Sequence, residues 1–536
     1  SGASDLPLPL LTAIVIGSMI GSGIFALPQN TAAGAGAGAI LIGWLVSGLG
    51  MLCLAFVYQT LAWRQPKLDN GVYAYARASA GEYVGFNAAW GYWVSAWIGN
   101  VGYFVILFGA LGIFFPAFGE GNTPLAIGAA SLLLWVMHFL ILRGVHGAAV
   151  LNAITTVAKV LPLLLFLVFV LLAFQTPVFT ADFWGKPELG SVMDQVKSTM
   201  LVTVWAFIGI EGASVVSGRA KSRADVGRAT LLGFVVVLAL LMGVSLLSLG
   251  ILSQPELAAL KNPSMAGVLE RAAGPWGGPL ITIAMLVSVG GALLAWTLLA
   301  AETLFRPARD AVLPKWLAQE NTQGVPASAL WITNGLVQLF LLITLFSNAT
   351  YLALITLATS MILVPYLLSA VHALASASAW KGYEAGESAT RSRDMALGGV
   401  ALAYCVWLLY AAGVKYLLLA ALLYAPGALL FAWARREQGR PVFKGLEWAL
   451  LAALLAYARA MILWQDRHRH CGVCGAPNRA SEGGFVMACT RLGCDHKSFP
   501  RIDPAVIVLV HRGDRCLLGR QAAWPEGRFS TIAGFV

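Results

Sequence analysis

Two hydrophobic segments of this sequence are interrupted by glycine at corresponding places. The first segment holds the run IGSMIGSGIF at residues 16–25, and the sixth holds WAFIGIEGAS at residues 205–214. Lipid offers no hydrogen-bond partner to freed backbone groups, so an unwound stretch inside a membrane is tolerated only where it lines a cavity. Paired breaks at matching positions of two repeats are typical of transporters, which bind substrate between the half-helices. The sequence therefore predicts a transport protein with broken helices 1 and 6.

The composition places most of the chain in a lipid bilayer. Of 536 residues, 59% are apolar and only 11% are charged. Apolar runs of about 20 residues, each long enough to cross a bilayer, recur about twelve times between residues 7 and 436. We expect an all-α polytopic membrane protein with a five-plus-five inverted repeat.

The net charge of +10 comes largely from positive residues that cluster in alternate loops. This distribution is the positive-inside pattern, and it predicts an N-terminus in the cytoplasm. With about twelve spans, the chain after residue 434 is expected to be cytoplasmic as well. The distribution of charge therefore indicates a multi-pass protein of the cell (inner) membrane, with the lipid bilayer as its partner. It does not indicate a nucleic-acid partner.

Several short motifs carry a family resemblance. The runs IGSGIF at residues 20–25 and GVYAYA at residues 71–76 resemble the amino acid–polyamine–organocation transporters. Five further runs narrow the resemblance to the basic amino acid antiporters: WIGN at 97–100, WAFIGIE at 205–211, WTLLA at 296–300, RDAVLP at 309–314 and ARREQ at 434–438. The resemblance covers roughly residues 5–450. It implies exchange of basic amino acids, such as arginine for ornithine or lysine, by alternating access.

The first break offers backbone amides to a carboxylate. The amides of Ser22, Gly23 and Ile24 are expected at the positive end of a half-helix, where glycine lets a ligand touch the backbone. Close helix packing is the alternative for small residues in membrane helices, and we favour it for Gly17. At residues 21–23 the matching break in the sixth segment favours a substrate site.

The sixth segment supplies complementary acceptors. Carbonyl groups released near Ala206, Phe207 and Ile208 are suited to accept hydrogen bonds from an α-ammonium group. An amino acid would then be held by one break at its carboxylate and by the other at its ammonium group.

Three mid-span side chains complete the predicted substrate site. Trp205 and Trp296 lie away from the membrane interfaces, where most membrane tryptophans are found. A desolvated indole face attracts a guanidinium or ammonium group by about 2 kcal/mol, although packing is the alternative for both residues. In the family, the residue matching Trp296 lies against the substrate side chain, and the one matching Trp205 gates the outer path. Asn100 either binds the distal end of the ligand or makes an interhelical hydrogen bond.

Two ionisable residues inside spans are candidates for coupling or gating, since charge is expensive there and usually functional. Glu211 follows the break in the sixth segment, and the resemblance favours a gating or proton-linked role for it. Lys159 either cycles a proton or braces the first span against the eighth, with snorkelling as the alternative. A matching lysine occurs in proton-coupled family members, so proton-coupled symport through Lys159 is the alternative to exchange.

Four cysteines near the C-terminus have the spacing of a metal site. Cys471 and Cys474 form one close pair, and Cys489 and Cys494 form another fourteen residues later. Two such pairs can wrap a tetrahedral Zn²⁺, and four thiolates leave no open position for catalysis. A cytoplasmic location keeps thiols reduced, which favours structural zinc over disulfides.

The sequence from about residue 457 to residue 536 resembles a second family. The runs CGVCG at 471–475, FPRIDPAVI at 499–507 and AGFV at 533–536 are similar to the zinc-ribbon-containing NADH pyrophosphatases of the Nudix superfamily. In that family the catalytic Nudix box, with its metal-binding glutamates, follows directly after the last of these runs. This sequence stops at Val536, so we expect an incomplete α/β Nudix fragment without enzyme activity. A membrane-tethered NADH pyrophosphatase is the alternative function from another class, and a truncated fusion or an assembly chimera is the favoured origin.

We therefore expect four parts in the chain. They are a transporter domain at 1–436, a basic loop and apolar connecting helix at 437–466, a zinc ribbon at 467–498 and a truncated Nudix start at 499–536. If residues 446–464 form a further span, the ribbon faces the outside; if they do not, it stays in the cytoplasm. The basic loop before them favours the cytoplasmic placement. The oligomeric state stays open, with a homodimer as one option.

Overall fold

The chain divides into two compact units, Ser1–Leu454 and Leu455–Val536. The structure, a computed structural model, describes residues 8–68, 71–144, 148–210, 223–347, 350–481 and 486–500, and beyond them the strands 505–508, 510–512, 515–517 and 532–535. Glu211 is outside these ranges. The predicted part boundaries at residues 437, 467 and 499 stay predictions.

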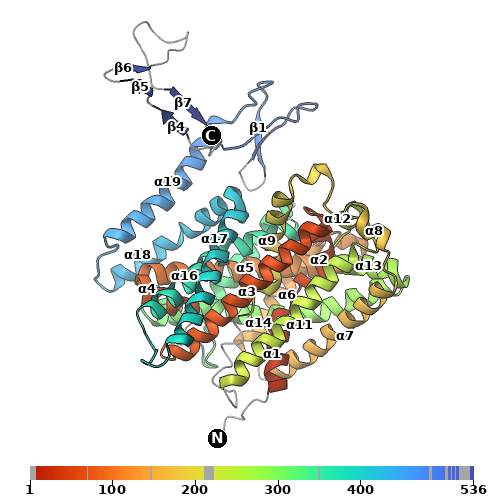
Figure 1. Cartoon of the computed structure of the whole chain (residues 1–536), viewed down its shortest axis with the longest axis horizontal. Helices are drawn as coiled ribbons and strands as arrows, with labels where there is room; N and C mark the ends of the chain where they lie inside the picture. The colour runs from red at the N-terminus through yellow and green to blue at the C-terminus, as the bar shows by residue number, and fades with distance from the viewer. Residues whose placement is uncertain are drawn as a thin grey trace. The chain divides into compact units, whose positions relative to one another are not determined.

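The first unit is all-helical in its described residues and forms the large bundle in Figure 1. Its elements are α1 (Leu8–Met19), α2 (Gly23–Ala32), α3 (Ala37–Arg64), α4 (Gly71–Ala80), α5 (Glu82–Leu111), η1 (Pro116–Phe118), α6 (Pro124–Leu142), α7 (Ala148–Leu172), α8 (Thr176–Ala181), η2 (Pro187–Leu189), α9 (Val192–Phe207), α11 (Arg223–Ser248), α12 (Gln254–Ala258), α13 (Ser264–Ala273), α14 (Gly277–Arg309), η4 (Lys315–Ala318), α15 (Ala327–Ser347), α16 (Tyr351–Ser378), α17 (Ser388–Tyr424) and α18 (Gly427–Glu437).

Within the described residues, nine helical segments are long and apolar enough to cross a membrane. Two of these segments, Ser388–Gly413 and Lys415–Glu437, follow each other along α17 and α18. The helical path is kinked between them at Gly413, which has φ 71°. The prediction of an all-α polytopic membrane protein is confirmed. The count of about twelve spans stays a prediction, because α1, α2 and α9 have only 12, 10 and 16 residues and a span needs about 20.

Helix α5 is the interior helix of the bundle. In its most apolar 18-residue stretch, 94% of the residues are buried. Trp90, Trp93 and Trp97 follow one another along it, with ring centroids 4.8 and 6.2 Å apart. Helices α14 and α16 both pack against α5. Because α5 is packed between these helices, Asn100 on α5 lies in the interior of the bundle.

The first predicted break lies between α1 and α2. Helix α1 ends at Met19, and α2 begins at Gly23 with its first turn tightened by a hydrogen bond of 3.2 Å from the Phe25 amide to the Ser22 carbonyl. The sixth segment leaves the helix after Phe207. Ile208 turns to φ −58° and ψ 130°, and Gly209 has φ 108°, a conformation that glycine adopts without strain. Both segments are thus non-helical for three residues within the described part of the predicted glycine-rich runs, at 20–22 and at 208–210.

A buried arginine ties the end of α18 to the start of α5. The Arg435 side chain is 4% exposed and lies 2.9 Å from Glu82 and 3.5 Å from Glu447 of α19 (Gly445–Arg467). Glu82 also pairs with Arg77 and with Arg440, each at 3.4 Å. Removing one partner of a buried ion pair leaves a desolvated charge, which costs far more than losing a surface pair.

The second unit contains the end of α19 and short antiparallel strands. Strands β1 (Asn478–Ser481), β2 (Val486–Cys489) and β3 (Lys497–Ser498) form a sheet in that order. Strand β4 (Ala505–Val508) pairs with β7 (Ile532–Phe535), and β5 (Val510–Arg512) pairs with β6 (Arg515–Leu517).

The substitution Arg435→Met should destabilise the first unit by about 3 kcal/mol, because it leaves Glu447 without its buried partner. Thermal unfolding of the detergent-solubilised protein measures the effect as a lowered midpoint. The control is Lys261→Ala, since Lys261 is 78% exposed and lies 4.0 Å from Glu120, and its loss should change stability by less than about 0.5 kcal/mol. Equal midpoints for the two variants would contradict the structural role of Arg435.

Candidate functional site

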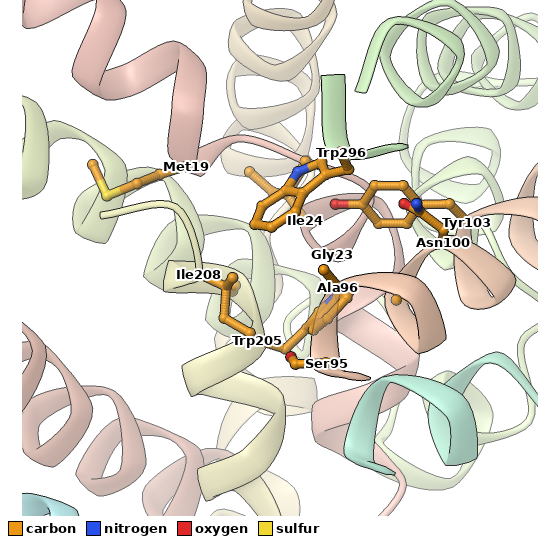
Figure 2. A pocket seen from close by; sticks show the side chains of 13 residues that line it. Met19, Gly23, Ile24, Ser95, Ala96, Asn100, Tyr103, Trp205, Ile208 and Trp296 are labelled. Carbon is orange, nitrogen blue, oxygen red and sulfur yellow. The ribbon is translucent and has the colours of Figure 1, made fainter. Parts of the chain in front are cut away.

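A pocket lies where the two broken segments meet. Its walls come from α1, α2, α5, α9 and α14, and Figure 2 shows the labelled side chains gathering around Gly23. The lining residues are Met19, Gly21, Gly23, Ile24, Ser95, Ala96, Gly99, Asn100, Tyr103, Trp205, Ala206, Ile208 and Trp296. Seven of the eight predicted substrate-binding residues are among them.

The eighth residue, Ser22, is not a lining residue. It is fully buried, and its hydroxyl lies 2.9 Å from the hydroxyl of Tyr351 at the start of α16. The Ser22 side chain therefore links two helices, and its predicted amide contact to a ligand stays a prediction.

The start of α2 brings backbone to the pocket. The amides of Gly23 and Ile24 open this helix, and such amides have no acceptor within the helix. A Cβ atom at Gly23 would lie 3.0 Å from Cδ1 of Trp205. A side chain at this position would therefore force the indole to shift, whereas glycine lets the chain pass this close without a shift. The arrangement leaves a positive helix end facing a small cavity.

The end of α9 brings backbone carbonyls to the same pocket. Ala206 and Ile208 both line it, whereas Phe207 points into the core and packs between Trp44 and Phe234 at 5.8 and 5.0 Å. The last carbonyls of a helix lack the usual amide partner one turn on. A negative helix end thus borders the pocket close to the positive end of α2.

Two tryptophans and a tyrosine form the aromatic part of the lining. Trp205 meets Tyr103 edge to face, with ring centroids 6.0 Å apart. Trp205 Nε1 donates a hydrogen bond of 3.2 Å to the Tyr351 hydroxyl. Trp296 is partly buried and reaches the pocket from α14 (Figure 2).

Asn100 is the one amide side chain of the lining, and it is 1% exposed. Its Nδ2 atom donates to Thr297 Oγ1 at 3.4 Å, which is an interhelical contact between α5 and α14. Its Oδ1 atom is buried and has no partner among the described residues. An unmade acceptor of this kind costs about 1–3 kcal/mol, which a donor on a ligand would recover.

The described lining contains no carboxylate, lysine, arginine or histidine. A charged ligand in this pocket would meet helix ends, aromatic faces and the Asn100 amide instead of an opposite formal charge. Such a pocket suits a small zwitterion with an extended cationic side chain.

The side chains of the two predicted coupling residues lie outside the described part of the structure. Lys159 belongs to α7, but its side chain lies outside the described part of the structure, as does the whole of Glu211. Their predicted roles stay predictions.

Ser95, Ala96, Gly99 and Tyr103 line the pocket without having been predicted. All four lie on α5 near Asn100, and in the order just given they are five, four, one and three residues away from it. Residues three or four apart share a helix face. Helical periodicity counted from Asn100 would have found Ala96 and Tyr103.

The four predicted metal ligands of the second unit lie together. The Sγ atoms of Cys471, Cys474, Cys489 and Cys494 are all within 4.8 Å of one another. Cys474 and Cys489 are 3.4 Å apart, and Cys471 and Cys494 are 3.9 Å apart. Both distances exceed an S–S bond of about 2.05 Å. They are close to the roughly 3.8 Å between ligands of a tetrahedral zinc with Zn–S bonds of about 2.3 Å.

Backbone amides around these cysteines favour their thiolate forms. The Val473 amide donates to Cys471 Sγ, and the Arg491 amide donates to Cys489 Sγ, both at 3.4 Å. The Ala476 amide is the main reason that the pKa of Cys474 falls to about 7, whereas desolvation and the neighbouring thiols raise the pKa of Cys489 and of Cys494. Because thiolates are the ligating form of cysteine, the cluster is suited to hold a metal ion.

Comparison with known proteins identifies the first unit. A curated arginine/ornithine antiporter of Pseudomonas aeruginosa is 57% identical over 461 residues, which cover 84% of this chain and 95% of that protein. An arginine/agmatine antiporter of Chlamydia pneumoniae is 42% identical over 80% of this chain and 90% of its own. An L-lysine transport protein of Corynebacterium glutamicum is 43% identical over 84% and 93%. The profile of the amino acid permease family matches residues 8–432. The chain therefore belongs to the amino acid permease family.

Proposed function

We propose that this protein exchanges basic amino acids across the inner membrane by alternating access, for example arginine for ornithine or lysine. The observation that carries the proposal is the pocket between the two broken segments, which offers a positive helix end, a negative helix end and aromatic walls within one small cavity. The names of the relatives as arginine/ornithine and arginine/agmatine antiporters support the same substrate class.

The two helix ends bind the backbone of the amino acid. The amides of Gly23 and Ile24 hold the carboxylate at the positive end of α2. The carbonyls of Ala206 and Ile208 accept hydrogen bonds from the α-ammonium group. Both groups are common to all amino acids, so this half of the site does not select a side chain.

The aromatic lining and Asn100 select the side chain. The indole of Trp296 lies against the guanidinium or ammonium group, which an aromatic face attracts by about 2 kcal/mol when water is excluded. The unpaired Oδ1 of Asn100 accepts one of the N–H bonds at the distal end of the substrate. Its Nδ2 bond to Thr297 keeps the amide in the orientation that makes Oδ1 the available atom.

An uncharged pocket is consistent with exchange. It binds one basic amino acid as well as another of the same charge, because no fixed carboxylate in the described lining is tuned to a single cation. Trading arginine for ornithine moves no net charge across the membrane, so the exchange follows the two concentration gradients alone. Proton-coupled symport through Lys159 and a tethered NADH pyrophosphatase are not favoured, since the relatives are named as antiporters.

The remaining topological assignments are part of this proposal. The topology comprises about twelve spans in a five-plus-five inverted repeat and an N-terminus in the cytoplasm. The proposal further includes coupling or gating by Glu211 and Lys159 and a homodimer as the assembly. The glycine breaks in the first and sixth segments and the alternating basic loops support the first two assignments.

The second unit is proposed to carry a structural zinc on its four cysteines. The sulfur distances and the amide bonds to Cys471 and Cys489 support this metal. Residues 467–498 are accordingly assigned as a zinc ribbon and residues 499–536 as the start of a Nudix fold. No enzyme activity is assigned to either part.

Counterflow in proteoliposomes tests the transport function. Labelled arginine should enter vesicles preloaded with ornithine, lysine or arginine and should not enter unloaded vesicles, because each substrate must be traded for another. Uptake into unloaded vesicles driven by an inward proton gradient would contradict exchange and support symport.

The substitution Trp296→Leu should raise the KM for arginine about thirtyfold, since it removes an aromatic contact of about 2 kcal/mol to the cationic side chain. The matched control is Trp433→Leu. Trp433 is 50% exposed on α18, does not line the pocket and should leave the KM unchanged. A similar KM for both variants would remove Trp296 from the substrate site.

The substitution Cys474→Ser should abolish the zinc that copurifies with the protein, as measured by inductively coupled plasma mass spectrometry, because three thiolates hold the ion less tightly than four. Cys53→Ser is the control, since Cys53 is buried in α3 of the first unit and should leave the zinc content unaltered. Full zinc content in Cys474→Ser would show that the metal is held elsewhere.

A further inference from the structure

A hydrogen-bonded bridge joins both broken segments to the start of α16. The Tyr351 hydroxyl lies 2.9 Å from Ser22 Oγ and 3.2 Å from Trp205 Nε1. An indole N–H can only donate, so the Tyr351 oxygen accepts from Trp205, and either hydroxyl can donate in the bond between Tyr351 and Ser22. Tyr351 is therefore the residue at which α9, α16 and the turn between α1 and α2 are tied together.

The bridge is shielded and firmly anchored. Ser22 is 0% exposed and Tyr351 is 4% exposed, so water does not replace either bond in this structure. Thr350 caps α16 by accepting a hydrogen bond of 3.3 Å from the Ala353 amide. The Tyr351 ring thus projects from the first turn of a capped helix, which restricts where its hydroxyl can go.

The indole of Trp205 occupies a narrow slot. A Cβ atom at Gly23 would lie 3.0 Å from Cδ1 of Trp205, and a Cβ atom at Gly99 would lie 2.8 Å from Cη2. Tyr103 closes a third side with an edge-to-face contact at 6.0 Å. Because Nε1 is the sole polar atom of the indole, its bond to Tyr351 fixes which edge of the ring faces the pocket.

We propose that Tyr351 is a positioning residue for amino acid exchange, which holds the Trp205 indole across the pocket and couples α16 to both breaks. The proposal rests on the function proposed above. When the bridge is absent, the indole rotates in its slot and the pocket loses one wall. The bound substrate is then less well covered, and its affinity falls while the rate of the exchange cycle is retained.

The substitution Tyr351→Phe tests the bridge, since it keeps the ring and removes both hydrogen bonds. The Kd of the solubilised protein for arginine and the KM for arginine/ornithine exchange in proteoliposomes should both rise about tenfold, which is about 1.4 kcal/mol. The maximal exchange rate should change less than about twofold. Tyr424→Phe is the matched control, because it removes another buried hydroxyl, which donates to the Met361 carbonyl at 3.0 Å, and it should leave both constants unchanged.

A double-mutant cycle distinguishes positioning from a general packing defect. Trp205→Phe removes one of the two bonds to Tyr351, so Tyr351→Phe should raise the Kd by a smaller factor in that background than in the wild-type protein. Ser22→Ala breaks the other bond and should raise the Kd in the same direction, which provides a second variant if Tyr351→Phe folds poorly.

A wild-type Kd for Tyr351→Phe, or an effect that multiplies with that of Trp205→Phe, would overturn the bridge. Failure of the wild-type protein to exchange arginine for ornithine would overturn the proposed function instead. The two failures are distinguishable because the binding measurement does not depend on flux.

Discussion

The architecture depends on what happens to peptide groups that leave a helix inside a membrane. Lipid cannot bond to them, so the interruptions at the first and sixth segments persist only if ligand, side chain or neighbouring backbone supplies partners. In this protein Gly23 and Ile24 at the start of α2 and Ala206 and Ile208 at the end of α9 line one pocket. The requirement to satisfy these groups is the physical reason for placing the proposed binding site at the breaks.

The described lining of the pocket carries no formal charge, and in the proposed mechanism this gives the pocket its selectivity. Helix ends and aromatic faces attract a zwitterion with a cationic side chain without creating a deep well for any one cation. The unpaired Oδ1 of Asn100 adds direction to this attraction. A fixed carboxylate would bind each substrate more tightly, but tight binding slows release, and a carrier must release its substrate on both sides of the membrane.

Much of this site could be predicted from sequence because its parts are unusual at mid-span. Glycine runs, Trp205, Trp296 and Asn100 are conspicuous within apolar segments, and all three of these side chains line the pocket. Tyr351 could not be predicted, since a tyrosine at a helix start is unremarkable and its partners Ser22 and Trp205 are 329 and 146 residues away in sequence. The cysteine cluster was predictable from spacing alone, because each pair is brought together by a short local turn.

The pocket is bordered by one continuous, buried helix and by the interrupted ends of others. Helix α5 has an unbroken ladder of backbone hydrogen bonds and is buried along most of its length, so moving it would require repacking the whole bundle. The ends of α1, α2 and α9 lack such ladders at the breaks, and small dihedral changes there tilt a half-helix without unmaking a core. In the proposed mechanism, substrate held between α5 and the breaks would lie against one fixed surface and two adjustable ones. In the proposed exchange cycle, that asymmetry would let the pocket open toward either side while the contacts from Asn100 on α5 stay in place.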